Sequence, residues 1–230
     1  MISRIFAACT VLASLSAAAV AAERPVVVEL FTSEGCSSCP PADAYLSELS
    51  RERRDVLPLA FHVTYWNSLG WTDPFSLAAA TQRQSRYGAR FGDGSYTPEL
   101  VVDGRKGLVG SERGEAEAAI ATARHAGLTA ASVTATRQGS AVSINVGGGR
   151  GSGRVILVGY DAQHHTAVGR GENGGRTLTE SNIVRSIRAI GQWTGAPLTL
   201  DAAAPAGEKA AVLIEAPDGS IIGAARADAS

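Results

Sequence analysis

Two closely spaced cysteines are the residues of this sequence best suited to chemistry. The chain holds three cysteines, and Cys36 and Cys39 enclose a Ser-Ser pair directly before two prolines. The N–H groups and dipole of a helix start stabilise a thiolate at Cys36, while Cys39, one turn later, can attack a mixed disulfide and release the partner. We therefore predict a redox pair in which Cys36 is the nucleophile and Cys39 is the resolving thiol.

The same pair is compatible with two other kinds of site. A structural disulfide between residues so close in sequence closes a small loop and adds little stability. Two thiolates can also hold a soft cation such as Cu(I) or Zn(II), but they supply only two of the four ligands that zinc takes. His62 is the candidate for a third ligand, although a half-buried strand histidine is the commoner case. We assign neither a metal nor a cofactor to the chain.

The first half of the chain alternates strand-like and helix-like segments around the pair. The β-branched run at 25–31 predicts a strand buried on both faces, and the two prolines suit the first turn of a helix. Apolar residues recur in that helix at helical spacing from Ala42, which places Asp43 on the outer side. The other predicted elements are a strand at 56–63, a helix at 76–87, a hairpin at 99–102 and 107–110, and a helix at 112–125.

The second half of the chain is richer in glycine and loses helical periodicity. Short apolar segments separated by glycine-rich turns predict strands of a small antiparallel sandwich. Gly169-x-Gly171-x-x-Gly174 resembles a dinucleotide fingerprint only in its letters, and Asn173-Gly174 is more typical of a hairpin turn. The predicted strands span residues 131–136, 141–146, 155–160, 182–190 and 211–215, and we place the boundary between the halves near residues 127–130.

The first residues have the pattern of a secretory signal peptide. Arg4 precedes an apolar run at 5–20, and Ala19-Val20-Ala21 fits the small-residue cleavage rule. We expect cleavage after about residue 22, no stable membrane span afterwards, and a periplasmic or secreted protein. A membrane anchor is the alternative. Export places the cysteines where disulfides persist, and the balance of 21 basic against 22 acidic residues argues against nucleic acid as a partner.

An aromatic loop at residues 64–75 carries Trp66 and Trp71. Its Gly, Asn and Pro residues are typical of a segment without regular structure. The two indoles either cover the fold as packed side chains or form the apolar wall of a substrate groove beside the cysteines. We list both as candidate substrate-binding residues.

The motif and the order of elements over residues 24–127 resemble the thioredoxin fold. That resemblance implies a cis Thr97-Pro98 peptide bond facing the cysteines, where the Thr97 backbone orients an extended partner. It also implies that Glu29 lies near the buried acid of thioredoxins, where it could serve as general base for Cys39. The expected architecture is an α/β thioredoxin-like domain at residues 23–127, with a mixed sheet and flanking helices, followed by a mainly β, sandwich-like domain at 128–230.

Three longer stretches are similar to the signatures of a family of secreted bacterial proteins classed as domain of unknown function 1223. They are residues 28–43 around the cysteines, residues 65–74 in the aromatic loop, and residues 171–178, which read GENGGRTL. The family label implies a fold and no reaction, so the predicted mechanism rests on the cysteines.

These patterns together predict an exported thiol–disulfide oxidoreductase that acts on a protein or small-molecule disulfide. Cys36, Cys39, Thr97, Pro98 and Glu29 are its candidate catalytic residues. The alternatives are a periplasmic metal-handling protein that uses the two thiolates, and a non-catalytic binding protein on the same scaffold. The second half would recruit partners or form a homodimer.

Overall fold

The computed structural model describes residues 24–126 and 131–229. The predicted signal peptide at residues 1–22 and the boundary near 127–130 lie outside the described residues. No helix in the two described ranges is long and apolar enough to cross a membrane.

The described residues contain three α-helices, a short 3-10 helix and eleven strands, joined by loops. The helices are α1 (Pro40–Glu52), α2 (Ala78–Phe91), α3 (Arg113–Ala126) and the 3-10 helix η1 (Tyr65–Leu69). The strands are β1 (Val26–Thr32), β2 (Val56–His62), β3 (Glu99–Val102), β4 (Lys106–Val109), β5 (Val133–Gln138), β6 (Ala141–Val146), β7 (Gly153–Ala167), β8 (Thr177–Trp193), β9 (Leu198–Ala203), β10 (Lys209–Glu215) and β11 (Ile221–Ala229).

All eleven strands of the described residues form one mixed sheet, in the order β4-β3-β1-β2-β8-β7-β10-β11-β5-β6-β9. The expected thioredoxin-like α/β domain followed by a separate sandwich-like domain is therefore wrong. β8, from the second half of the chain, lies beside β2, from the first half, with Ala60 paired to Ile183 in parallel. The physical reason is that β8 covers backbone groups at the edge of β2 that a separate domain would leave unpaired.

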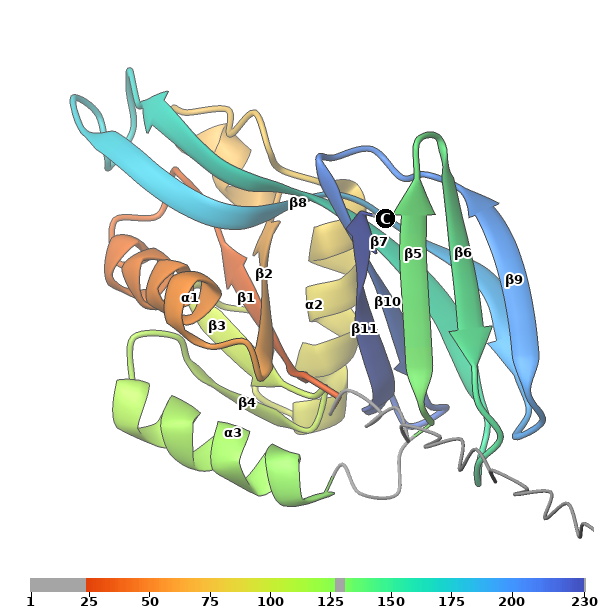
Figure 1. Cartoon of the computed structure of the whole chain (residues 1–230). Helices are drawn as coiled ribbons and strands as arrows, with labels where there is room; N and C mark the ends of the chain where they lie inside the picture. The colour runs from red at the N-terminus through yellow and green to blue at the C-terminus, as the bar shows by residue number, and fades with distance from the viewer. Residues whose placement is uncertain (1–23, 127–130, 230) are drawn as a thin grey trace, which may run out of the picture.

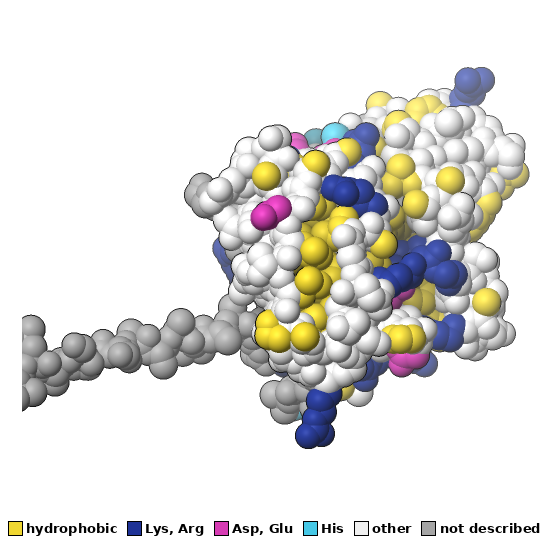
Figure 2. All heavy atoms as spheres, turned by 90° about the vertical axis from the view of Figure 1, so that its right-hand side faces the viewer, with side chains coloured by type: hydrophobic (Ala, Val, Ile, Leu, Met, Phe, Trp, Pro, Cys, Tyr) yellow, Lys and Arg dark blue, Asp and Glu magenta, His cyan; other side chains and the backbone are white. Residues whose placement is uncertain are grey.

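The hydrophobic core also joins the two halves. One buried cluster packs Phe31 and Leu57 against Val158, Leu213 and Ile221. It lies on the face of β1 and β2 that α2 covers, whereas α1 and α3 pack on the opposite face around a second cluster (Figure 1). A third cluster fills the second half, where β5, β6 and β9 pack with β7, β8 and β10. Seen from that side, Figure 2 shows an elongated strip of apolar side chains flanked by basic ones.

The predicted order of strands and α-helices in the first half is confirmed. Two details differ: the aromatic loop, expected without regular structure, contains η1, and one position of α1 faces inward. The two prolines begin α1, and its apolar stripe from Ala42 to Leu49 is buried. Asp43 was expected on the outer side and is instead only 6% exposed. It turns inward because Thr32, at the end of β1, donates a hydrogen bond of 2.8 Å to its carboxylate.

The hairpin formed by β7 and β8 is the longest feature of the sheet. The two strands have 15 and 17 residues, and they pair antiparallel from Gly153 opposite Trp193 to Ala167 opposite Thr177. Figure 1 shows the hairpin reaching past the other second-half strands to the side where α1 lies. Its turn, residues 168–176, is called the hairpin tip below. The tip brings the second half of the chain to the cysteines.

Candidate functional site

Cys36 and Cys39 form a disulfide at the start of α1, with their Cα atoms 5.4 Å apart. Cys39 is the N-cap residue of the helix. The hydroxyl oxygen of Ser38 lies 3.3 Å from the sulfur of Cys36. Both cysteine side chains are 0% exposed. The predicted pair is thus joined by a bond, and solvent does not reach it in this conformation.

The hairpin tip lies on the backbone around the disulfide. Asn173 is fully buried and donates its side-chain amide to the carbonyl oxygens of Cys36 and Glu34, each at 2.9 Å. The neighbouring Glu172 accepts a hydrogen bond of 3.0 Å from the backbone N–H of Ser37. Three hydrogen bonds therefore hold the tip on the disulfide segment.

Thr97, Pro98 and Trp66 lie together beside the same segment. The Thr97-Pro98 peptide bond is cis, and the Thr97 hydroxyl accepts a hydrogen bond of 2.8 Å from the indole N–H of Trp66. A Cβ atom added at Gly35 would lie 3.3 Å from Cβ of Trp66. Trp66 therefore connects the residue before Cys36 to the cis proline segment.

Trp71 lies between the disulfide segment and the hairpin tip. Its indole N–H donates a hydrogen bond of 2.7 Å to Glu34. Cβ atoms added at Gly169 and Gly171 would lie 3.3 Å and 3.2 Å from Trp71, so the glycines of the tip allow the chain to approach the ring. Both tryptophans are partly exposed and have their N–H groups bonded.

Glu29 belongs to a different cluster. Its oxygens accept hydrogen bonds from both Arg83 and Tyr87 on α2, with 2.9 Å to Arg83 Nη2 and 2.8 Å to the Tyr87 hydroxyl. Arg83 also donates to Glu215 on β10, at 2.5 Å. Glu29 is thus bonded to α2. It lies on the face of β1 opposite α1, the helix that begins at the cysteines.

Other ionisable groups are buried near the disulfide, and we call them the acid–imidazole cluster: Glu34, Asp43, His62, Asp73 and Glu180. None of these side chains is more than 6% exposed. The His62 ring lies 2.7 Å from Asp73 through Nδ1 and 3.7 Å from Glu180 through Nε2. Asp73 accepts a hydrogen bond of 2.9 Å from the N–H of Glu34, and Asp43 donates its N–H to the carbonyl of Cys39 at 3.1 Å. The cluster is therefore bonded to both ends of the disulfide segment.

Three groups of the cluster have pKa values above their usual ones. Burial alone would lower the pKa of His62, but the carboxylates of Asp73 and Glu180 outweigh it and raise that pKa to about 10. Burial raises the pKa of Glu180 to about 8 and that of Asp43 to about 6, against the opposing effects of His62 and the Thr32 hydrogen bond. The cluster therefore pairs the His62 imidazolium with Asp73, while burial makes Glu180 and Asp43 weaker acids that exchange protons closer to neutral pH than free carboxyl groups do.

His62, the candidate third metal ligand, faces carboxylates through both ring nitrogens. Within the described ranges, no three or more His, Cys, Asp or Glu side chains are arranged to hold a metal ion.

The structure places the cysteines, Thr97, Pro98 and the two tryptophans close together, and their predicted roles stay predictions. The sequence did not single out the buried polar groups around them. Their places in the sequence could have indicated them. Glu34 and Asp43 lie on either side of the cysteine pair, and Asn173 lies in the stretch 171–178, which resembles a family signature. The partners of these groups are far away along the chain, so spacing alone did not reveal them.

Comparisons with known proteins support the fold over most of the chain. A family model described as "Protein of unknown function (DUF1223)" matches residues 27–215. The crystal structure of protein AGR_C_4864 from Agrobacterium tumefaciens is 31% identical, with a TM-score of 0.76 over 88% of this chain and 93% of that chain. HBP35 of Porphyromonas gingivalis, at 15% identity, shares the fold with a TM-score of 0.66 over 90% of this chain and 77% of that chain. No curated protein matches.

Proposed function

The chain belongs to the DUF1223 family, and we propose that it is an exported thiol–disulfide oxidoreductase that works through Cys36 and Cys39. The observation that carries the proposal is the acid–imidazole cluster beside the disulfide. Burying charged groups costs free energy unless every group is paired. Both oxygens of Glu180 and Nε2 of His62 have no hydrogen-bond partner among the described residues. A bridge that only stabilised the fold would need no such cluster.

The proposed reaction moves two electrons and two protons between the pair and a partner. A thiolate of a reduced partner attacks Cys36, a bond forms between the two sulfurs, and Cys39 leaves as a thiolate that takes a proton. The partner's second thiol loses its proton, attacks its own sulfur in the mixed disulfide, and releases Cys36, which is protonated in turn. The products are the oxidised partner and the protein dithiol. The reverse sequence reduces a partner disulfide.

Asp43 is the group that we assign to the proton on Cys39. It lies in the first turn of α1 and is bonded through its N–H to the Cys39 carbonyl. A pKa raised to about 6 by burial lets it both release and accept a proton near neutral pH. This role replaces the one expected for Glu29, whose oxygens are held by Arg83 and Tyr87.

Both cysteines are 0% exposed, so exchange requires a movement that uncovers them. We assign this movement to the hairpin tip, which is bonded to the backbone of Ser37 and Cys36. A partner that competes for the Ser37 N–H and the Cys36 carbonyl would displace Glu172 and Asn173. In the open site, Trp66 and Trp71 would provide apolar walls and the Thr97 backbone would orient an extended partner segment. The tip would thus shield the disulfide until a partner binds.

Trapping the partner tests the proposal. The Cys39→Ala variant should accumulate a mixed disulfide through Cys36 in cells, and Cys36→Ser should abolish both this adduct and disulfide turnover. Turnover that survives Cys36→Ser would refute the proposal. So would a reduction potential of the pair below about −300 mV, because bonds of that potential resist exchange and behave as structural bridges. Tight Cu(I) binding that disappears in Cys36→Ser, without turnover, would instead support metal handling.

A further inference from the structure

A second site lies at the other end of α1. A cavity of about 420 Å³ opens between the last residues of that helix and strands β5, β10 and β11. Six basic side chains line it: Arg51, Arg53, Arg54, Arg137, Lys209 and Arg226. Glu208 is the one acidic residue in its lining. We propose that this basic cavity binds a small multivalent oxyanion, such as a compound with several phosphate or carboxylate groups.

Two arginine guanidinium groups are oriented by hydrogen bonds to backbone carbonyl oxygens and have no ion pair among the described residues. Arg226 donates to the carbonyl oxygens of Arg54, at 3.1 Å, and of Val56. Arg137 donates to the carbonyl oxygens of Gly207 and Glu208, each at 3.0 Å. A carbonyl fixes the direction of a guanidinium and leaves its full positive charge. Both groups are therefore held in place at the cavity with their charge uncompensated.

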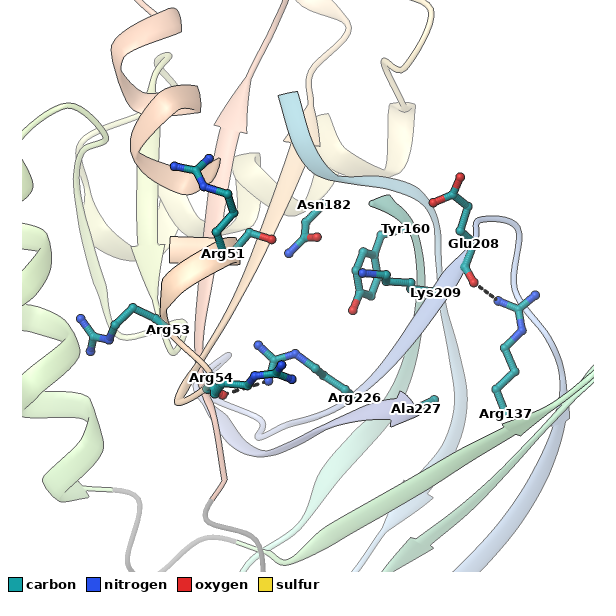
Figure 3. A pocket seen from close by; sticks show the side chains of 11 residues that line it. Arg51, Arg53, Arg54, Arg137, Tyr160, Asn182, Glu208, Lys209, Arg226 and Ala227 are labelled. Carbon is teal, nitrogen blue, oxygen red and sulfur yellow. Dashed lines mark hydrogen bonds between the residues drawn. The ribbon is translucent and has the colours of Figure 1, made fainter. Parts of the chain in front are cut away.

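Arg54 and Lys209 add two cations without an ion pair in the described part of the chain. In Figure 3, the side chain of Arg226 extends toward Arg54 and that of Lys209 toward Tyr160, while the carboxylate of Glu208 points away from both. That carboxylate accepts the N–H of Ala162 at 3.0 Å. The one carboxylate of the cavity lining is thus turned away from Lys209 and Arg226, and like charges gathered at one cavity favour an anion between them.

The end of the helix accounts for only part of this charge. Basic residues at a helix C-terminus complement its dipole, which is a sufficient reason for those of α1. Arg53, moreover, is bound to Asp55 and Glu117, each at 2.9 Å, and points away from the cavity in Figure 3. No helix end explains Arg137, Lys209 and Arg226, which come from strands β5, β10 and β11 and line the same cavity.

The dimensions and donors select the kind of ligand. A volume of about 420 Å³ suits a small molecule. Guanidinium groups match phosphate and carboxylate oxygens in two-point contacts. The disulfide lies at the start of α1, one helix length of 13 residues away, which is about 20 Å. The basic cavity is therefore independent of the proposed redox function.

Calorimetric titration with pyrophosphate and with citrate, at constant ionic strength, tests the proposal on the whole exported protein. We expect saturable binding of at least one of them, which would also distinguish phosphate from carboxylate ligands. Lys209→Ala and Arg54→Ala should each weaken it about tenfold, the effect of losing one charge-assisted hydrogen bond. Neither side chain has a partner in the described residues, so both variants should fold. Arg150→Ala, an exposed arginine outside the cavity, should bind as the unmodified protein does.

Three results would overturn the inference. The first is that neither pyrophosphate nor citrate binds more tightly than acetate at equal ionic strength. The second is that Arg150→Ala weakens binding as much as Lys209→Ala, because the attraction would then be spread over the surface. The third is binding of a long polyanion such as heparin without binding of the small anions. Binding that persists in the double variant Cys36→Ser, Cys39→Ser would separate this site from the redox proposal.

Discussion

The side-chain amide of Asn173 donates to the carbonyl oxygen of Cys36 across 2.9 Å, although 137 residues separate the two along the chain. This contact joins the most specific stretch of the second half to the cysteine pair of the first half. It holds the hairpin tip on the backbone of the disulfide segment, so the surroundings of the disulfide depend on both halves of the chain.

Replacing Asn173 should open the disulfide. Asn173→Ala removes two buried hydrogen bonds and leaves the carbonyls of Glu34 and Cys36 without those donors, a loss of about 1–3 kcal/mol. We expect the disulfide to be reduced several-fold faster by dithiothreitol, as measured by thiol release. Glu172→Gln keeps an oxygen that can accept from Ser37 and should change the rate little. An unchanged rate in Asn173→Ala would show that the tip does not control access.

The pH profile of exchange should contain the titration of Asp43. Its pKa is raised to about 6 by burial, so we expect the rate of disulfide exchange to inflect near that pH. Asp43→Asn should remove the inflection and slow the exchange at pH 7. Glu48→Gln, on the outer side of the same helix, is the matched control and should keep it. A profile that is the same in Asp43→Asn as in the unmodified protein would exclude Asp43 from the proton transfer.

Glu180 should make the fold less stable as the pH rises from 4.5 to about 8. Its pKa rises from 4.5 to about 8 in the folded protein, because burial disfavours the carboxylate. The unfolded chain therefore binds fewer protons than the folded one between these pH values, and the free energy of unfolding should fall as pH rises through that window. Urea unfolding should show this fall, and Glu180→Gln should reduce it. A fall of equal size in both proteins would contradict the assignment.

Arg83 should couple the two halves of the chain. It is 2% exposed and binds Glu29 on β1 and Glu215 on β10. Arg83→Met leaves both carboxylates buried without this cation, which should cost about 3–5 kcal/mol. Arg86→Met, on the exposed side of the same helix, should cost much less.

The same unfolding experiments test whether the sheet is one cooperative unit. Far-UV circular dichroism and the fluorescence of Trp193, isolated by replacing the other tryptophans, should report one urea transition with one midpoint. Two separated transitions would mean that the halves unfold independently.

Helical and strand periodicity was informative where contacts are local. The prolines at the start of α1, its apolar stripe and the buried strand β1 all follow from the types of neighbouring residues. The same reasoning placed Asp43 outward, because periodicity describes one helix and does not include Thr32 on the strand beside it.

The cysteine pair of the candidate site could be located from the sequence, whereas the buried polar groups around it could not, and the predicted redox chemistry of the pair stays a prediction. Cys36 and Cys39 are recognisable because a three-residue spacing directly before two helix-starting prolines is a local pattern of the sequence. Glu29 was chosen for its place near the pair, but a side chain on a strand points to one face only, and here that face is the one covered by α2. His62, the candidate metal ligand, lies beside the carboxylates of Asp73 and Glu180, which its place in the sequence did not indicate.

The sequence by itself determined the cysteine pair, the helix that begins beside it and the order of elements around it, since each depends on residues within a few turns of one another. Only the tertiary structure decided that β8 continues the sheet from β2, that the hairpin tip is bonded to Cys36, and that four acids and an imidazole are buried near the disulfide. These arrangements depend on which strand edges pair and on which buried polar groups find partners. The strand pairing and the tip contact join residues more than a hundred positions apart, and even the closer pairs of the cluster, such as His62 with Asp73, lie on different segments of the chain.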